Sequence, residues 1–175
     1  MDLKYKIIFL DYWHTSSGLS AGAKLDSSVA KDSDGLPYLS GKTIKGLVRE
    51  MANLLDDGSF IKKCFGEEGV DMGECYFSNA TLNKDKKDEK DEIVSNNLQD
   101  NLYSVIASTK MENGIAVDDS LREIEVVIPI SLYGEILDID SHEDKEKLLK
   151  ALKMIKRIGL NRNRGLGRCE IKEIK

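Results

Sequence analysis

The sequence predicts an α+β fold of the ferredoxin-like (RRM-like) type, arranged βαββαβ as a single domain over residues 1–175, with a thumb-like insertion at about residues 83–120. Two amphipathic helical stretches alternate with strand-like stretches in the order β-α-β and again β-α-β. A charged tract of about 40 residues separates the two halves, which is too long for an ordinary connection and is therefore either disordered or functional. At 175 residues and 41% hydrophobic composition, the chain can bury one core without a second domain.

The first half is predicted to contain two strands and a helix. Residues 3–12 are rich in Ile, Phe, Leu and Tyr, which is typical of a largely buried strand. Over residues 42–55 apolar side chains recur at spacings of three and four, which predicts a helix capped by Ser40 or Gly41. Residues 74–82 mix aromatic and β-favouring residues and predict the second strand.

The second half repeats this order. Every second residue from Ile124 to Leu132 is Ile, Val or Leu, which predicts a strand over residues 124–133 with one face on the core. Pro129 suggests that this strand lies at a sheet edge. Ser141, with Asp144 three residues later, resembles a capping box, and the apolar stripe that follows predicts the second helix. Residues 169–174 form the predicted closing strand.

The composition argues against several classes of protein. The N-terminal apolar run is too short to span a bilayer and lacks the layout of a signal peptide, so we expect a cytoplasmic protein without membrane contact. The three cysteines are odd in number and include no Cys-x-x-Cys pair, which argues against a disulfide framework and a structural zinc site. With only two histidines, no metal-binding residues are predicted from nitrogen and sulfur ligands.

One tripeptide raises the question of nucleotide binding. Gly41, Lys42 and Thr43 match the end of a phosphate-binding P-loop. The pattern requires a glycine where this chain has Leu36, and Pro37 removes one N–H donor from the same loop. We therefore expect no bound nucleoside triphosphate.

Charge is unevenly distributed along the chain. The net charge of -5 argues against a simple nucleic-acid binder, whose affinity usually comes from a basic surface. Much of the acid lies in the mixed-charge run at residues 84–92, which is typical of a solvated loop. Two other segments are locally basic: Lys42, Lys45 and Arg49 in the first helix, and Arg162, Arg164 and Arg168 in a glycine-rich loop.

Three stretches carry further motifs. LDSSVAKDSDGLPYLSGKTIKGLVRE, residues 25–50, has two aspartates six residues apart, then Gly-x-Pro-Tyr and Ser-Gly-x-Thr-x-Lys-Gly. CFGEEGVDMGECYFSNATL combines Phe-Gly with a following strand, and GLNRNRGLGRCEI combines a glycine-rich loop with a final strand. Together they resemble the RAMP superfamily, the backbone-type subunits of type III CRISPR interference complexes, over nearly the whole chain. The chain has Ser40 where the family usually has proline, and its C-terminal loop is rich in Asn and Arg.

The resemblance implies an RNA-binding fold in antiviral defence, whose copies stack head to tail along a guide RNA, with target RNA and other effector subunits as partners. A helix N-terminus offers N–H groups and partial positive charge to phosphates, glycines allow close backbone approach, and arginines supply forked donors. The predicted RNA-binding residues are Ser40, Lys42, Thr43, Lys45, Arg49, Arg162, Arg164, Gly165, Gly167 and Arg168.

The resemblance also points to Asp26 as the catalytic candidate, because the family has an aspartate at the matching place that is needed to cut guide-paired target RNA. A carboxylate there can hold Mg²⁺ or another divalent metal, or orient the 2′-hydroxyl of the target strand. The alternative interpretation is an ordinary loop carboxylate. Turn-forming roles are predicted for four other aspartates: Asp32, Asp34, Asp118 and Asp119.

The insertion occupies the place of the family's thumb hairpin, which wedges between guide and target and unstacks a base. Tyr103, Ile106 and Met111 are the predicted wedge residues. A partly disordered loop is an equally good interpretation of residues 84–97.

Three other functions stay open from the sequence. The first is a non-catalytic RNA-binding scaffold in which Asp26 is incidental. The second is a metal-independent endoribonuclease that processes guide RNA with His14 as general base, whereas His142 is predicted to lie in the first turn of the second helix. The third is a ferredoxin-like protein-interaction domain that binds no RNA.

Overall fold

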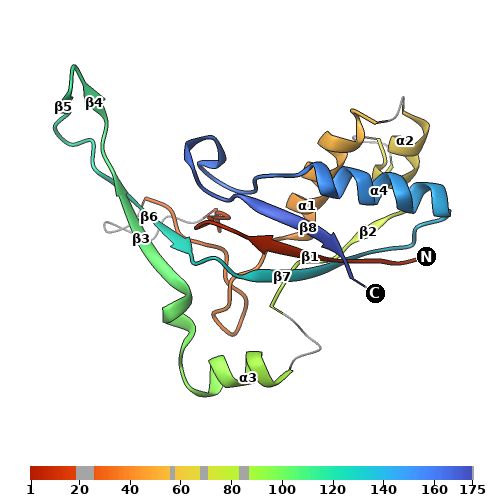
Figure 1. Cartoon of the computed structure of the whole chain (residues 1–175), viewed down its shortest axis with the longest axis horizontal. Helices are drawn as coiled ribbons and strands as arrows, with labels where there is room; N and C mark the ends of the chain where they lie inside the picture. Colours follow the sequence, from red (N-terminus) through yellow and green to blue (C-terminus); the bar gives the residue numbers. More distant parts are fainter. Residues whose placement is uncertain (19–25, 56–57, 68–70, 83–86, 175) are drawn as a thin grey trace.

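Four antiparallel strands form the main sheet of the computed structural model, which describes residues 1–18, 26–55, 58–67, 71–82 and 87–174 (Figure 1). Their order is β2-β7-β1-β8, so β1 and β7 are central. The strands are β1 (Leu3–Phe9), β2 (Tyr76–Phe77), β7 (Ser131–Leu137) and β8 (Cys169–Glu173). Helices α1 (Gly41–Ala52) and α4 (His142–Met154) lie on the same side of this sheet. This arrangement confirms the predicted ferredoxin-like fold.

The core lies between the sheet and these two helices. Alternate side chains of β1, Leu3, Tyr5 and Ile7, are fully buried, as the period of two in a strand requires. The apolar stripes of α1 and α4 meet them through Val48 and Leu148, which are also fully buried.

Both helices begin at the predicted caps. The Ser40 hydroxyl accepts a hydrogen bond from the Thr43 N–H at 3.2 Å, and the Ser141 hydroxyl accepts one from the Asp144 N–H at 3.1 Å. His142 is the first residue of α4, as predicted. The shorter helix α2 (Ser59–Phe65), which was not predicted, follows α1 and contributes buried apolar side chains to the same core.

Gly41 allows α1 to approach β2 closely. A Cβ atom on Gly41 would lie 2.0 Å from the Phe77 carbonyl oxygen, so we expect Gly41→Ala to lower the free energy of unfolding by about 1–3 kcal/mol. A Cβ atom on Gly46 in the same helix would meet no atom within 4 Å, so Gly46→Ala should raise the free energy of unfolding by about 0.5–1 kcal/mol. Chemical denaturation of both variants checks this, and equal effects would contradict the packing argument.

The predicted single strand over residues 124–133 is wrong, because the chain forms two strands in two different sheets there. Strand β6 (Arg122–Val127) belongs to a separate two-stranded sheet, and β7 begins at Ser131. Pro129 lies in the break, since it has no N–H to donate to a strand ladder. The alternation of apolar residues continues across the break, so the pattern does not indicate where one strand ends and the next begins. Strand β7 is a central strand rather than the predicted edge strand.

The insertion forms a long hairpin that projects away from the main sheet (Figure 1). Strands β3 (Tyr103–Ser108) and β6 pair along its length, and β4 (Met111–Glu112) pairs with β5 (Ile115–Ala116) near its tip. We call residues 103–127 the thumb hairpin. The hairpin returns through β6 and so extends past residue 120, the approximate end predicted for the insertion.

Two helices precede the thumb hairpin. They are α3 (Lys87–Ser95) and the 3₁₀ helix η2 (Gln99–Leu102), so residues 87–95 are helical rather than a disordered loop, whereas residues 83–86 lie outside the described residues. Among the helices described, none is long and apolar enough to cross a bilayer.

Candidate nucleic-acid interface

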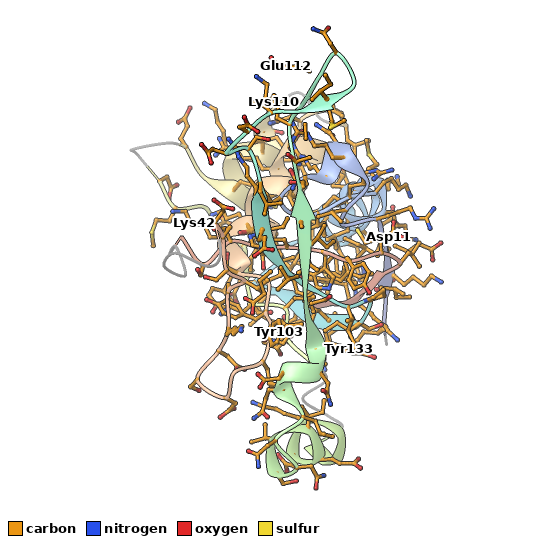
Figure 2. The ribbon with its side chains drawn as sticks, turned by 90° about the vertical axis from the view of Figure 1, so that its left-hand side faces the viewer. Asp11, Lys42, Tyr103, Lys110, Glu112 and Tyr133 are labelled. Atoms are coloured by element: carbon orange, nitrogen blue, oxygen red, sulfur yellow. The ribbon has the colours of Figure 1, made fainter. Side chains whose placement is uncertain are left out.

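The two predicted basic segments lie on opposite sides of the molecule. Viewed from the thumb hairpin in Figure 2, Lys42 lies at one side and Asp11 at the other. Asp11 marks the glycine-rich loop, because its carboxylate lies 3.2 Å from Arg168 Nε. The thumb hairpin rises between these two sides. A nucleic acid that touched both segments would therefore have to cross the base of the hairpin.

The N-terminus of α1 is better satisfied than the sequence predicts. The Gly41 N–H donates to the Asn79 side-chain oxygen at 2.8 Å, and the Thr43 N–H donates to Ser40. The hydroxyls of Ser40 and Thr43 also lie 2.8 Å apart and are hydrogen-bonded to each other. Free N–H groups at this helix end are consequently few, so the predicted phosphate contact there depends on side-chain charge.

Lys42 and Lys45 line one open groove of about 280 Å³ at this end of α1. Met72, which is 85% exposed, and Tyr76, which is 58% exposed, line the same groove. Lys45 Nζ donates to the Met72 carbonyl oxygen at 2.7 Å, whereas Lys42 is exposed. Arg49 lines a different groove, so the three basic residues of α1 do not form one site.

Cys75, also in the lining of the first groove, forms a buried pair with Cys64. The hydrogen bond between the two thiols is the main cause that raises the pKa of Cys64 and lowers the pKa of Cys75. No sequence pattern indicates this pairing, because Cys64 lies in α2 and Cys75 lies in the segment before β2.

The glycine-rich loop is held firmly against the start of the chain. The Leu160 N–H donates to the His14 carbonyl at 2.9 Å, and the Gly167 N–H donates to the Tyr12 carbonyl at 2.8 Å. Between these anchors, Arg162–Arg164 form the 3₁₀ turn η3. The loop thus presents its arginines from a fixed backbone.

The three arginines of this loop differ in their partners. Arg168 is ion-paired with Asp11, and the Arg162 carbonyl oxygen accepts a hydrogen bond from Arg157 Nη1 at 3.2 Å. Arg164 is exposed. Across the described part of the chain, no carboxylate lies within ion-pair distance of the Arg162 or Arg164 side chain. These two are the better candidates for phosphate contact.

The two glycines predicted to bind RNA have different roles. A Cβ on Gly165 would meet no atom within 4 Å, so its surface is open to a ligand. A Cβ on Gly167 would lie 1.9 Å from the Ile158 carbonyl oxygen, and Gly167 is buried. Internal packing therefore requires a glycine at position 167, and RNA contact there stays a prediction.

Asp26 lies alongside strand β6 of the thumb hairpin, four residues along the β3–β6 ladder from the Tyr103–Val127 pair at its base. Its N–H donates to the Glu123 carbonyl at 2.9 Å, and its carboxylate Oδ2 accepts from the Glu123 N–H at 2.8 Å. The residue is exposed, and among the described residues its second carboxylate oxygen makes no hydrogen bond. Asp26 is thus placed by β6 while one oxygen stays accessible, and its catalytic role stays a prediction.

The fit of a divalent metal to this place can be judged from the donors around it. Within the described ranges, no group of three or more His, Cys, Asp or Glu side chains could enclose a metal ion. Mg²⁺ commonly binds through one or two carboxylates together with water and substrate phosphates, so one accessible carboxylate fits such a site only when RNA supplies the rest.

His14 is unsuited to the general-base role considered above. Its side chain is fully buried, with Nδ1 2.6 Å from the Glu125 carbonyl oxygen and Nε2 3.0 Å from the Ser27 hydroxyl. Both ring nitrogens are engaged, and RNA has no access to them. His14 instead ties the segment next to Asp26 to strand β6.

Other contacts fasten the thumb hairpin to the loop that follows Asp26. Glu125 accepts from the Val29 N–H at 2.9 Å and from Lys31 Nζ at 2.8 Å. Lys31 Nζ also lies 3.9 Å from the centre of the Tyr103 ring, and the Tyr103 hydroxyl donates to the Gly35 carbonyl at 2.7 Å. Burial, followed by the charge of Glu125, raises the pKa of Tyr103, which keeps this donor protonated.

The three predicted wedge residues differ in their surroundings, and their role as a wedge stays a prediction. Tyr103 anchors the base of the hairpin, and Ile106 is half-buried along its length. Met111, 56% exposed near the tip, is placed for a wedge. Ile115 on the facing strand is 72% exposed and was missed, because a single apolar residue between turns carries no signal of its own.

The four aspartates predicted to form turns do so. Asp32 Oδ1 accepts from the N–H groups of Asp34 and Leu36, both at 2.9 Å. Asp34 also pairs with Lys90 at 2.7 Å, which raises the pKa of that lysine. Asp118 and Asp119 form a turn in which Asp119 has a φ of 55°.

Comparisons with known proteins identify the family of this chain and structures that share its fold. The family profile described as the RAMP superfamily matches residues 6–170. A chain of a solved structure, "Cryo-EM structure of the Type III-B Cmr-beta bound to cognate target RNA", is similar at 12% sequence identity with a TM-score of 0.76, covering 99% of this chain and 97% of the other. A second, from "Type III-B Cmr-beta Cryo-EM structure of the Apo state", has 12% identity, a TM-score of 0.75, and covers 100% and 98%. No curated protein matches the sequence. At such identities the structural likeness shows a shared fold.

Proposed function

Because this chain belongs to the RAMP superfamily, we propose that it is a guide-RNA-binding subunit of a type III CRISPR effector complex in antiviral defence. The family profile spans residues 6–170, and the structural similarity covers the thumb hairpin as well as the sheet. One of the similar structures is, by its description, bound to cognate target RNA. These findings support RNA and other effector subunits as the partners of this chain.

The observation that carries the proposal is the position of the thumb hairpin between two basic segments. Lys42 lies on one side, and Asp11, which is ion-paired to the glycine-rich loop, lies on the other. Lys42 and the loop arginines Arg162 and Arg164 offer cations to a phosphate backbone. Such contacts position a nucleic acid without reading its sequence, which suits a protein that must accept any guide.

We further propose that the subunit cleaves target RNA next to Asp26. The carboxylate lies beside the hairpin that would separate guide and target, and β6 holds it through two hydrogen bonds to Glu123. A bound divalent cation would supply charge stabilisation at the scissile phosphate, and Asp26 would contribute one oxygen to it.

A non-catalytic scaffold is the second candidate. It is favoured by one observation, that Oδ2 of Asp26 already has a structural partner in the Glu123 N–H. In that case Asp26 would only fasten the loop to the thumb hairpin, and the complex would bind target RNA without cutting it.

Assembly along RNA provides the test of the proposed function. We expect copies of this subunit to associate head to tail, a contact that does not close on itself, and we expect a long guide RNA to promote the association. The contact would involve the thumb hairpin and the segment from residue 14 to 26, of which residues 19–25 lie outside the described residues. Light scattering with and without RNA measures this, and a strict monomer in both conditions, with no co-purifying subunit, contradicts it.

A further inference from the structure

The main sheet has a second face, opposite α1 and α4, which we call the open sheet face. The strand register places Lys6 of β1 between Lys172 of β8 and Tyr133 of β7, in one row across three strands. In the next row, Ile8 lies between Glu170 and Ser131. The first row therefore combines two cations with an aromatic ring on a flat surface.

The opposition of Lys6 and Lys172 is unfavourable in the isolated protein, because like charges directly across a sheet repel each other. Glu170 relieves Lys172 through an ion pair of 3.1 Å. Within the described residues, Lys6 has no carboxylate at ion-pair distance, and Lys4, two residues along the same face, has none either. An anion laid over this row would remove the repulsion.

The aromatic ring of this row lies within reach of the same ligand. Lys6 Nζ lies 5.3 Å from the centre of the Tyr133 ring, and its flexible stem allows the ammonium to turn from the ring to a phosphate. The Lys172 side chain is 62% exposed, whereas Lys6 and Tyr133 are half-buried. All three side chains of the row are therefore at least partly accessible to a ligand. At the neighbouring strand, Tyr76 on the same face is 58% exposed.

We propose that the open sheet face is a second contact surface for single-stranded nucleic acid, in which Lys6 and Lys172 hold phosphates and Tyr133 stacks on a base. Phosphates spaced along a strand match two cations, and a base supplies the flat partner that a tyrosine ring accepts regardless of sequence. An acidic protein segment would neutralise the lysines and leave the ring without a stacking partner. This surface goes beyond the function proposed above, whose contacts lie on α1 and the glycine-rich loop.

The test is fluorescence polarisation of a labelled single-stranded RNA against Lys6→Gln/Lys172→Gln, at several salt concentrations. Loss of two phosphate contacts should reduce the slope of log affinity against log salt by about 1.4. Tyr133→Leu should weaken binding by about tenfold, whereas Tyr133→Phe, which keeps the ring, should bind like wild type. Lys150→Gln/Lys153→Gln on α4 is the matched control for net charge, since both lysines are exposed on the helical side.

Each outcome decides the proposal, provided thermal unfolding shows the variants to be folded. Unchanged affinity in both Lys6→Gln/Lys172→Gln and Tyr133→Leu overturns it, and the function proposed above survives if the loop arginines still matter. Loss of a co-purifying acidic protein with unchanged RNA affinity also overturns it and makes the face a protein-docking surface. A wild-type protein that binds no RNA, alone or in its complex, overturns both proposals.

Discussion

The Asp26→Ala complex is expected to lose metal-dependent cutting of target RNA by about 100-fold or more while it keeps guide binding and assembly. The two functions should separate, because the carboxylate lies beside strand β6 of the thumb hairpin, whereas the proposed binding contacts lie on α1 and the glycine-rich loop. The measurement is cleavage of a complementary RNA in magnesium by the assembled complex, since a lone subunit has no paired target to cut.

Asp26→Asn is the informative control. Asparagine retains an oxygen to accept the Glu123 N–H but has no charge, whereas alanine removes both and leaves that N–H without its partner, at a cost of about 1 kcal/mol. Loss of cutting in both variants supports a catalytic carboxylate. Cutting that survives in Asp26→Asn but not in Asp26→Ala would make Asp26 a positioning residue. Equal cutting by wild type and both variants would show the catalytic assignment to be wrong, and a wild-type complex that does not cut would favour the scaffold.

The Arg162→Ala/Arg164→Ala variant is expected to bind single-stranded RNA about 10- to 100-fold more weakly than wild type. Neither guanidinium has a carboxylate partner among the described residues, so both charges are available to phosphates, and wild-type affinity should fall steeply with salt. The polarisation titration should also show little preference among RNA sequences, because phosphates carry no sequence information.

Two comparisons make this result specific. Arg168→Ala should have a smaller effect, because Arg168 is already paired with Asp11. Lys150→Ala/Lys153→Ala removes the same charge from the exposed surface of α4 and should bind like wild type. Salt-insensitive binding that is equal in all four proteins would contradict RNA contact at the glycine-rich loop.

Much of the fold could be predicted because its signals are local. Ser40 and Ser141 cap their helices as the sequence indicates, and the apolar run at residues 3–12 contains β1. The break near Pro129 could not be predicted in the same way, because the period of two continues through it while the partner strand changes from β3 to β1. Pairing partners are distant in sequence, and periodicity carries no information about them.

The candidate site was predictable in its residue types and less so in its geometry. The arginines of the glycine-rich loop stand out by composition, but the pairing of Arg168 with Asp11 depends on a contact across most of the chain. Likewise the sequence could not show that His14 is buried between Ser27 and Glu125, or that Tyr103 is held by Gly35. Such roles depend on which segments meet, and the thumb hairpin brings several distant ones together.

The central claim, that this chain is an RNA-binding subunit of an effector complex, is tested most directly by the nucleic acid that accompanies the protein from cells. The measurement is purification of the tagged wild-type chain under mild salt, followed by nuclease treatment and sequencing of the bound nucleic acid. We predict ribonuclease-sensitive guide RNA together with other effector subunits. A protein that is free of RNA and carries no effector subunit would contradict the account.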